Sequence, residues 1–221
     1  MHKTVVIICD GRFPKSDYPR YLISNADYVI CCDGALRKFI RNSEAIYGEK
    51  RLPDLVIGDM DTLPQSMQKK YADIIIKENE QEHNDQTKAF RWAIENIKDI
   101  SQIYILGATG EREDHTIGNI SLLMEYARMY DLEGMGINVE MVSDHATIFA
   151  VTDTFEMDCG EGRRISIFSP DNSLRICSEG LEWPTDDVVF DNWWKATLNR
   201  ASQDHIKLTF SHRSIALIMM N

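Results

Sequence analysis

Acidic and glycine-containing turns follow several apolar runs of the chain, and they carry the residues best suited to chemistry. The sharpest is Asp59-Met60-Asp61, just after the apolar run 55–57. In extended backbone, residues i and i+2 point to the same side, so two carboxylates would repel each other unless a cation lay between them. Mg²⁺ accepts such oxygen ligands and leaves other positions for phosphates. The alternative is a solvated acidic turn, since Asp and Gly are common in turns.

Two further segments at expected helix starts could complete such a site. Asp85 begins a helical pattern, where it would either face the two aspartates or serve only as a capping or first-turn acid. The turn 107–110 contains two glycines before a helix, so its backbone N–H groups could approach an anion. Arg112 could add a bidentate phosphate contact. Asp114 and His115 could shape the pocket, orient Arg112 or simply cap the helix.

The elements that must position these turns alternate between apolar runs and helical patterns. Continuous rather than alternating apolarity predicts strands buried on both faces, as in parallel sheets. We expect strands at 5–9, 28–32, 55–57, 74–76, 103–106 and 139–142, and helices at 36–43, 64–72, 85–97 and 115–130. This order predicts an α/β fold: an open, mostly parallel sheet with helices on both faces. Ligands of such sheets bind beyond the carboxyl ends of the strands, where the turns described above lie.

The pattern changes near residue 144, after which only short β-rich runs appear. These runs cover 147–151, 164–168, 188–190, 205–210 and 214–219. We therefore expect two domains: an α/β domain over 1–144 and a smaller all-β sandwich over 145–221. Trp183 could stack on a flat or cationic ring, or could simply be core packing. Asn199 is better explained as a turn residue than as a ligand contact.

Composition excludes several classes of partner. Lys and Arg total 24 against 35 Asp and Glu, a net charge of −11, which argues against nucleic acid and anionic membranes as partners. No apolar stretch approaches the roughly 20 residues of a membrane helix. The five cysteines are odd in number and lack zinc-site spacing, which predicts reduced thiols in a cytoplasmic protein. P-loop, G-x-G-x-x-G and G-x-S-x-G motifs are absent.

Taken in order, these motifs resemble those of the thiamin pyrophosphokinase family. The family's D-G-A, P-D-x-x-x-G-D-x-D-S, D-x-x-K-A and glycine-rich G-x-x-G-G-R-x-D-H motifs correspond to Asp33–Ala35, Pro53–Thr62, Asp85–Ala89 and Gly107–His115. Thr62 replaces Ser, Glu111 replaces a glycine, and Glu82 and Asn84 replace Asp and Thr just before Asp85. In the second domain, Gly180–Pro184 is similar to the family's G-L-K-[YW]-P. Thr197–Arg200 stands where the family has T-S-N-E.

The resemblance implies a homodimer that transfers a pyrophosphoryl group from ATP to the thiamin hydroxyl and releases AMP. It implies a nucleotide- and Mg²⁺-binding catalytic domain followed by a thiamin-binding domain, with thiamin near the dimer interface. On this basis Asp59, Asp61 and Asp85 are the expected Mg²⁺ ligands, and Asp33 is expected to bind substrate or help take the hydroxyl proton. Arg112 joins these acids as a catalytic residue. Expected ATP contacts are Gly34, Lys88, Gly107, Thr109, Gly110, Arg112, Asp114 and His115. Expected thiamin contacts are Trp183 and Asn199.

Two other functions stay open at the level of sequence. One is a different Mg²⁺-dependent diphosphotransferase or nucleotide hydrolase, and the other is a non-catalytic module that binds thiamin or nucleotide. Three carboxylates at one rim argue against the passive module, which has no need of them. Product analysis separates the enzymes, because AMP together with thiamin pyrophosphate is diagnostic and ADP is not.

Overall fold

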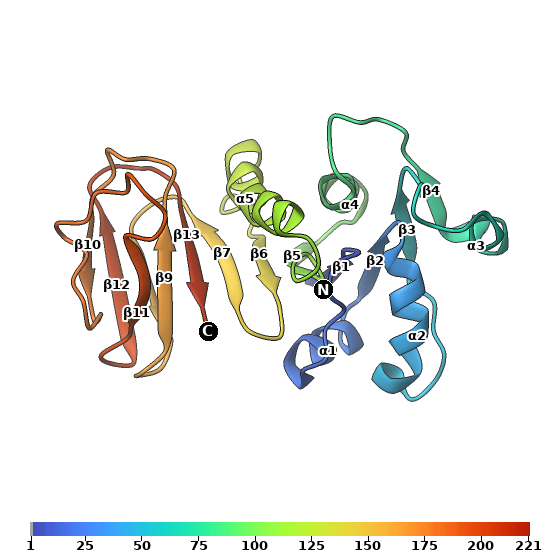
Figure 1. Cartoon of the computed structure of the whole chain (residues 1–221), viewed down its shortest axis with the longest axis horizontal. Helices are drawn as coiled ribbons and strands as arrows, with labels where there is room; N and C mark the ends of the chain where they lie inside the picture. The colour runs from blue at the N-terminus through green and yellow to red at the C-terminus, as the bar shows by residue number, and fades with distance from the viewer. Residues whose placement is uncertain (1) are drawn as a thin grey trace. The chain divides into compact units, whose positions relative to one another are not determined.

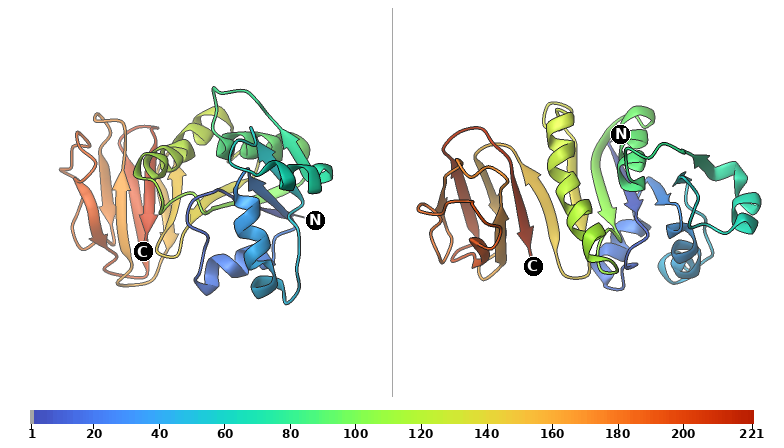
Figure 2. Two further views of the ribbon diagram at one scale, coloured as in Figure 1. Left: turned by 45° about the vertical axis from the view of Figure 1, so that its right-hand side comes forward. Right: turned by 45° about the horizontal axis from the view of Figure 1, so that its top comes forward.

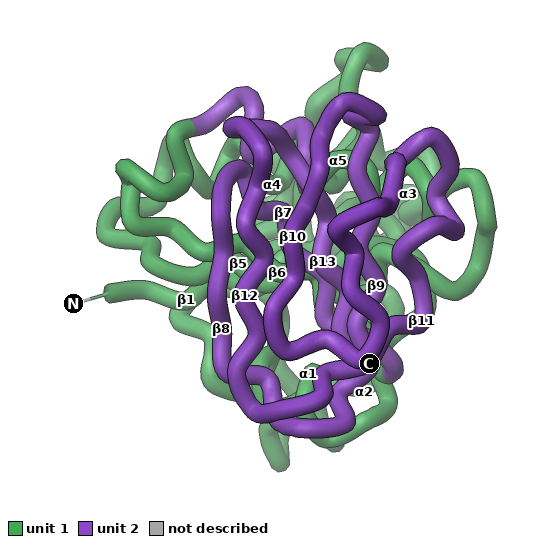
Figure 3. Tube along the Cα trace, turned by 90° about the vertical axis from the view of Figure 1, so that its left-hand side faces the viewer, with its two compact units in different colours: residues 1–122, 131–144 green, residues 123–130, 145–221 purple. Residues whose placement is uncertain are grey.

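The computed structural model describes residues 2–221, which form two compact units (Figure 3). The first comprises the chain up to Leu122 and residues Asp131–Asp144, and the second comprises Leu123–Tyr130 and His145–Asn221. The sequence-based division placed all of 1–144 in the first domain. The structure instead groups 123–130, the end of a long helix, with the second unit. Leu123, Met124 and Tyr126 are buried in this segment, so its apolar side chains contribute to a core.

Six strands of the first unit pair in parallel in the order β6-β5-β1-β2-β3-β4 (Figure 1). Residues 5–8 in the central strand β1 are completely buried, so that strand is covered on both faces, as its continuous apolarity predicts. The predicted parallel sheet is therefore confirmed. The strands are β1 (Lys3–Ile8), β2 (Tyr28–Cys32), β3 (Leu55–Gly58), β4 (Ile75–Lys77), β5 (Ile100–Leu106) and β6 (Asn138–Val142).

Helices cover both faces of this sheet. They are α1 (Asp17–Ser24), α2 (Ala35–Tyr47), α3 (Gln65–Lys70), α4 (Asp85–Asn96) and α5 (Glu113–Met129), with a short 3₁₀ turn at Ala72–Ile74. Leu22 of α1 and Phe39 of α2 share a core with Val6 of β1. Helix α4 packs on β1, β2 and β3 with Phe90 fully buried. None of the helices between residues 2 and 221 has the length and apolarity needed to cross a membrane.

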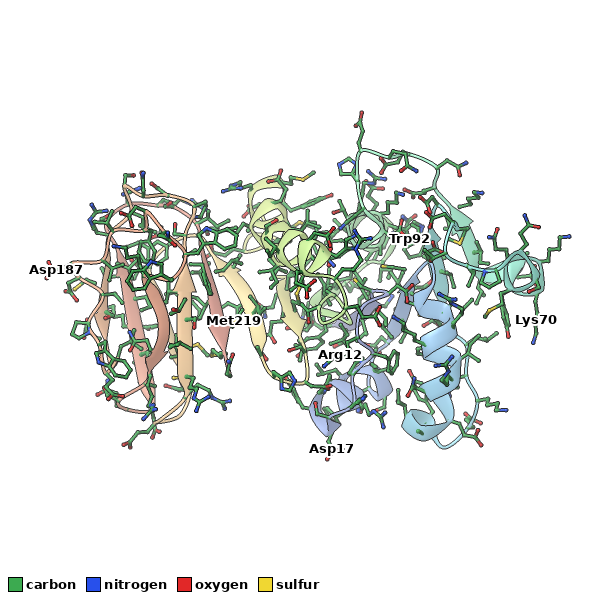
Figure 4. All side chains as sticks on the ribbon, viewed as in Figure 1. Arg12, Asp17, Lys70, Trp92, Asp187 and Met219 are labelled. Carbon is green, nitrogen blue, oxygen red and sulfur yellow. The ribbon has the colours of Figure 1, made fainter. Side chains whose placement is uncertain are left out.

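The order of the strands creates a crevice at one edge of the sheet. From β1 the chain proceeds outward through β2, β3 and β4, whereas β5 and β6 lie on the other side of β1. The loops after β1 and β5 therefore diverge, which is where doubly wound sheets bind ligands. Two backbone hydrogen bonds tie these loops together: Gly11 N–H donates to Gly107 O (2.7 Å) and Arg12 N–H to Thr109 O (2.9 Å). Arg12 is labelled in Figure 4.

The second unit contains two antiparallel sheets that share one core (Figure 2). Ile165, Ile167 and Ile218 from one sheet and Ile206 and Leu208 from the other are fully buried in it. This arrangement confirms the expected smaller β-sandwich. One sheet has the order β11-β9-β13-β7 and the other β10-β12-β8. The strands are β7 (Thr147–Val151), β8 (Phe155–Asp158), β9 (Arg164–Phe168), β10 (Ile176–Glu179), β11 (Ala196–Arg200), β12 (His205–Phe210) and β13 (Ala216–Met220).

Several details of the second unit differ from the sequence-based expectation. Residues 188–190, expected as a strand, form a loop in which Val188 N–H donates to Thr185 O (2.9 Å). Strands β8, β10 and β11 were not predicted. β8 and β10 have only four residues each and alternate in burial, which leaves a weak apolar pattern. β11 is interrupted by a register shift, which breaks the alternation by which strands are recognised.

Asp171 gives this unit a testable pH dependence. Its carboxylate accepts hydrogen bonds from Ser173 Oγ (2.6 Å) and Ser214 Oγ (2.7 Å) and lies 3.0 Å from His212 Nε2. These contacts hold the pKa of Asp171 well below its ordinary value. A carboxyl with a depressed folded-state pKa stabilises the fold above its unfolded pKa of about 3.9, and that contribution is lost as pH falls toward the folded-state value.

We expect Asp171→Asn to lower the free energy of unfolding by about 1 kcal/mol at pH 7. The difference should shrink at pH 3, where the unfolded wild-type carboxyl is protonated and the native one still ionised. Urea unfolding at both pH values measures it, with the exposed Asp187→Asn as the control. An equal deficit at pH 7 and pH 3 would assign the loss to packing and not to the charge.

Candidate active site

A cavity of about 650 Å³ opens at the carboxyl edge of the parallel sheet. Residues from the loops that follow β1, β2, β3, β4 and β5 line it. The turns after these strands therefore meet at one edge of the sheet, as expected. The loop after β1, with Cys9, Asp10 and Gly11, was not expected. Its signal was an Asp-Gly pair directly after an apolar run, as in Asp33-Gly34.

Three carboxylates converge in this cavity. Asp33, Asp59 and Asp61 each place an oxygen within 4.8 Å of the others. Asp33 is only 2% exposed, and its Oδ2 accepts a hydrogen bond from Thr62 N–H (3.0 Å). Among residues 2–221 its buried Oδ1 has no hydrogen-bond partner. A buried oxygen without a donor is costly, and a hard cation would satisfy it. The three carboxylates therefore fit Mg²⁺ as oxygen ligands.

The two aspartates of the Asp59–Asp61 motif converge by a different geometry from the one expected. Met60 adopts a left-handed conformation (φ 64°) and is buried in the core with 3% exposure. Asp61 N–H donates to Asp59 Oδ1 (3.1 Å), which closes a tight turn. The expectation of extended backbone is wrong here, because the central residue turns inward as an apolar anchor. That anchor leaves both carboxylates on the cavity side.

Proximity of the carboxylates perturbs their protonation. Partial burial, and next the negative charge of Asp59, raise the pKa of Asp61. Burial acts in the same direction on Asp59, but hydrogen bonds from Asp61 N–H and the Gln81 side chain outweigh it and lower the pKa of Asp59. Gln81 Nε2 reaches Asp59 Oδ2 at 3.2 Å from the loop after β4. The site thus concentrates negative charge, which a cation would relieve.

Asp85 lies beside the acidic cluster but is held by a lysine. Lys88 is 2% exposed, and its ammonium donates to Asp85 Oδ1 and to Glu78 O, both at 3.2 Å. Burial raises the pKa of Asp85, and Lys88 opposes that rise. Gly58 separates Asp85 from Asp33, since a Cβ there would lie 2.9 Å from Asp85 Oδ2 and 3.0 Å from Asp33 Cβ. Asp33 was expected as a substrate contact or proton acceptor. In the structure it lies with Asp59 and Asp61 in the group of three carboxylates.

Two asparagines fix the start of α4 and the floor of the cavity. Asn84 caps the helix by accepting from Thr87 N–H (3.0 Å), so Asp85 is a first-turn residue. Asn84 Nδ2 also donates to Asn119 Oδ1 (2.9 Å). Asn119, 8% exposed on α5, donates in turn to Ala108 O (2.8 Å). This chain of hydrogen bonds joins the loop after β5 to both helices.

The glycine-rich turn supplies part of the cavity wall. Thr109, Arg112 and His115 line the cavity, whereas Gly107 and Gly110 adopt left-handed conformations that shape the turn. Gly110 N–H donates to Thr116 Oγ1 (3.3 Å), so this amide is engaged within the turn.

Arg112, also in this wall, is oriented by a neighbouring acid. Its guanidinium contacts Asp114 through two hydrogen bonds (3.1 and 2.6 Å), which raise the pKa of Arg112. The Asp114 carboxylate thus contacts the Arg112 guanidinium through both of its oxygens.

Gly34 and Lys38 hold neighbouring loops in register. Gly34 N–H donates to Thr62 Oγ1 (3.1 Å), and a side chain at Gly34 would collide with the Asp10 carboxylate. Lys38 of α2 donates to Asp10 O and Gly11 O, both at 2.7 Å, and pairs with Glu111 of the glycine-rich turn at 2.9 Å. The sequence could not indicate Lys38, because its partners lie 27, 28 and 73 positions away.

A second cleft, of about 290 Å³, lies in the β-sandwich unit and brings together both residues expected to contact thiamin. Trp183 lines it and is 52% exposed, which excludes simple core packing for this side chain. Asn199 also lines it but is only 4% exposed. Lys195 and Leu198 complete one wall.

A doubly wound sheet with an acid-lined crevice at its carboxyl edge is typical of enzymes that bind phosphorylated nucleotides through a divalent cation. Comparison with protein families is more specific. Residues 19–133 match the thiamin pyrophosphokinase catalytic domain, and residues 147–216 match the thiamin pyrophosphokinase substrate-binding domain. The chain belongs to the thiamin pyrophosphokinase family. The reaction of this family is the transfer of a pyrophosphoryl group from ATP to thiamin, and the chain is an enzyme of this kind.

Individual relatives agree with this assignment. Thiamine pyrophosphokinase 1 of Oryza sativa subsp. japonica is 26% identical over 92% of this chain and 82% of its own length. The fold resembles the crystal structure of thiamine pyrophosphokinase from Bacillus subtilis, with a TM-score of 0.75, 18% identity and 99% of each chain covered. It also resembles thiamin pyrophosphokinase from Candida albicans, with a TM-score of 0.77, 16% identity, and 99% of this chain and 88% of that one covered.

Proposed function

We propose that the cavity of the first unit binds ATP with Mg²⁺ and that the cleft of the second unit binds thiamin. Asp33 carries the Mg²⁺ assignment: one of its carboxylate oxygens lies within 4.8 Å of oxygens of Asp59 and Asp61, and its buried Oδ1 has no hydrogen-bond partner among residues 2–221. Such an arrangement costs free energy unless a cation completes it. An acidic protein that binds a polyphosphate needs such a cation to offset repulsion between like charges.

Asp33, Asp59 and Asp61 are the proposed Mg²⁺ ligands, with Asp85 beside them. When bound, Mg²⁺ would neutralise phosphate charge and hold the phosphate oxygens in place. Asp33 thus moves from a possible proton acceptor to a metal ligand in this proposal. Asp85, which the sequence suggested as a Mg²⁺ ligand, is held by Lys88 and would lie next to the cation and the phosphates in this proposal. Lys88 sets the orientation of that carboxylate and brings positive charge to the cavity floor.

The remaining residues of the cavity position the nucleotide. Thr109, Arg112 and His115 are proposed ATP contacts because their side chains line the cavity. Arg112 would hold phosphate oxygens with Asp114 fixing its plane. Gly34, Gly107 and Gly110 serve through the backbone conformations and close approaches that they allow.

In the reaction, the thiamin hydroxyl oxygen attacks the β-phosphorus of ATP, and the bond from that phosphorus to the α-phosphate bridging oxygen breaks. AMP leaves with that oxygen, the hydroxyl proton is released to solvent, and thiamin pyrophosphate forms. Such transfers depend mainly on alignment and charge neutralisation. Trp183 would stack on a ring of thiamin. Thiamin is a cation, and a cation is attracted to the face of an indole.

A homodimer and a cytoplasmic location also remain proposals. The dimer follows from the resemblance described above, and the location follows from the reduced cysteines. All five cysteines are free, and Cys9, Cys31 and Cys32 are buried. Sedimentation of the purified chain tests the dimer directly.

Incubation of the enzyme with thiamin, ATP and Mg²⁺ tests the proposed reaction. We expect equal amounts of AMP and thiamin pyrophosphate, with no product when EDTA removes the cation. Formation of ADP, or release of AMP without thiamin, would favour a different diphosphotransferase or a nucleotide hydrolase. Thiamin binding without ATP consumption would favour a passive module.

A further inference from the structure

The side chain of Asn199 forms two hydrogen bonds with the backbone of Trp183. Asn199 Oδ1 accepts a hydrogen bond from Trp183 N–H (3.2 Å), and Asn199 Nδ2 donates to Trp183 O (2.7 Å). The two bonds hold both peptide groups that flank the Trp183 Cα. Only an amide side chain offers a donor and an acceptor together in this geometry. Because Asn199 is 4% exposed, these bonds are shielded from water, and loss of either would leave a buried polar group without its partner.

A bulge in β11 turns Asn199 inward. The register between β11 and β9 shifts between Ala196 and Asn199. Leu198, inside the shift, has a left-handed backbone (φ 58°) and is 76% exposed, and its N–H donates to Ser166 Oγ (3.1 Å). A non-glycine residue in this conformation stores strain that the surrounding structure must overcome. The extra residue reverses the alternation, so Asn199 faces the interior below Trp183.

The side-chain contact next to Asn199 is weak and exposed. Glu182 N–H donates to Arg200 O (2.8 Å), and the side chains of these two residues form an ion pair of 3.9 Å with both partners about half exposed. Exposed pairs of this kind contribute little. The family pattern has Lys and Glu at these two places, so this chain carries the opposite charge at each. Backbone contacts also join the two segments, since Leu181 and Ala201 form a β-bridge. Asn199 is the buried side chain that bonds to the Trp183 backbone itself.

We propose that Asn199 is a positioning residue that holds the Trp183 indole at the mouth of the cleft, and that it acts on thiamin only through Trp183. This role rests on the proposed binding of thiamin by Trp183. It replaces the expectation of a direct Asn199–thiamin contact, because the amide oxygen and nitrogen are already committed to the Trp183 backbone. Fixing an indole before the ligand arrives removes an ordering cost from binding.

A double-mutant cycle tests the proposal in the full-length enzyme. The variants are Trp183→Ala, Asn199→Ala and the double variant, with Asn172→Ala, an exposed asparagine of the same unit, as the control. We expect Asn199→Ala to raise the KM for thiamin about tenfold, which corresponds to about 1.4 kcal/mol, with the KM for ATP unchanged. Asn199→Asp keeps the acceptor and loses the donor, so it provides a second variant if the alanine variant folds poorly.

The cycle has outcomes that separate the possible failures. If Asn199 acts through Trp183, the double variant has the thiamin KM of Trp183→Ala alone. Additive increases would overturn the positioning role and restore a direct contact. An unchanged thiamin KM in both asparagine variants, with only a lower melting temperature, would reduce Asn199 to a structural residue. An unchanged thiamin KM in Trp183→Ala would overturn the proposed thiamin cleft and the positioning role together.

Discussion

Asp61→Asn is expected to lower kcat/KM by about a thousandfold while leaving the protein folded. Asparagine keeps the shape of the side chain but replaces a charged oxygen with a neutral one at a site where three carboxylates converge. If Asp61 is a cation ligand as proposed, its loss would weaken the cation's hold on the phosphates, and interactions of this kind are typically worth a factor of 10² to 10³ or more. Asp59→Asn should behave in the same way.

Stability provides a measure independent of activity. Without Mg²⁺, Asp61→Asn should melt at the wild-type temperature or slightly above it, because one of three mutually repelling charges is gone. With Mg²⁺ at ten times its Kd, the wild type should gain about 1.4 kcal/mol, and the variant should gain little.

Asp73→Asn removes an exposed acid elsewhere in the same unit and is the matched control. A full Mg²⁺-dependent stabilisation of Asp61→Asn would rule out this ligand set.

The parallel sheet could be predicted because its inner strands β1, β2 and β3 are buried on both faces and are therefore uninterrupted in apolarity. The bounds of β2 agree with the expected run 28–32, and those of β1 and β3 with small shifts. Helix α1 was missed, since its eight residues include Pro19 in the first turn and bury only three side chains. Edge elements such as β8 expose alternate residues and leave little trace in the sequence.

The candidate site could be predicted as a set of turns but not as a set of contacts. Strand-end position was enough to group Asp33, Asp59, Asp61 and Asp85. Which of them are placed to share the proposed cation depends on the left-handed Met60 and on Lys88, whose burial beside Asp85 arises only after folding. Likewise, nothing in the residue type of Asn199 shows that a bulge directly before it turns it inward.

Gly58→Ala is expected to reduce kcat/KM about a hundredfold, although no functional group is removed. Gly58 ends β3 between two acids of the site. An added methyl group would lie 2.9 Å from the Asp85 carboxylate and 3.0 Å from Asp33 Cβ, closer than carbon and oxygen pack. Asp85 is tied to Lys88 and Asp33 to Thr62 N–H, so neither can move without breaking a hydrogen bond. Displacements of about 1 Å in such sites typically cost a factor near 10².

Gly48→Ala separates this steric effect from backbone strain. Both glycines have a positive φ, 153° at Gly58 and 76° at Gly48, but no atom lies within 4 Å of the position of an added Cβ at Gly48. Alanine there should cost about 1 kcal/mol of stability and leave activity unchanged. Melting temperature, kcat and both KM values of the two variants provide the comparison. If the two variants lose stability equally and both keep full activity, displacement of the Asp33 and Asp85 side chains does not affect catalysis. The packing of their carboxylates across Gly58 would then have no part in catalysis.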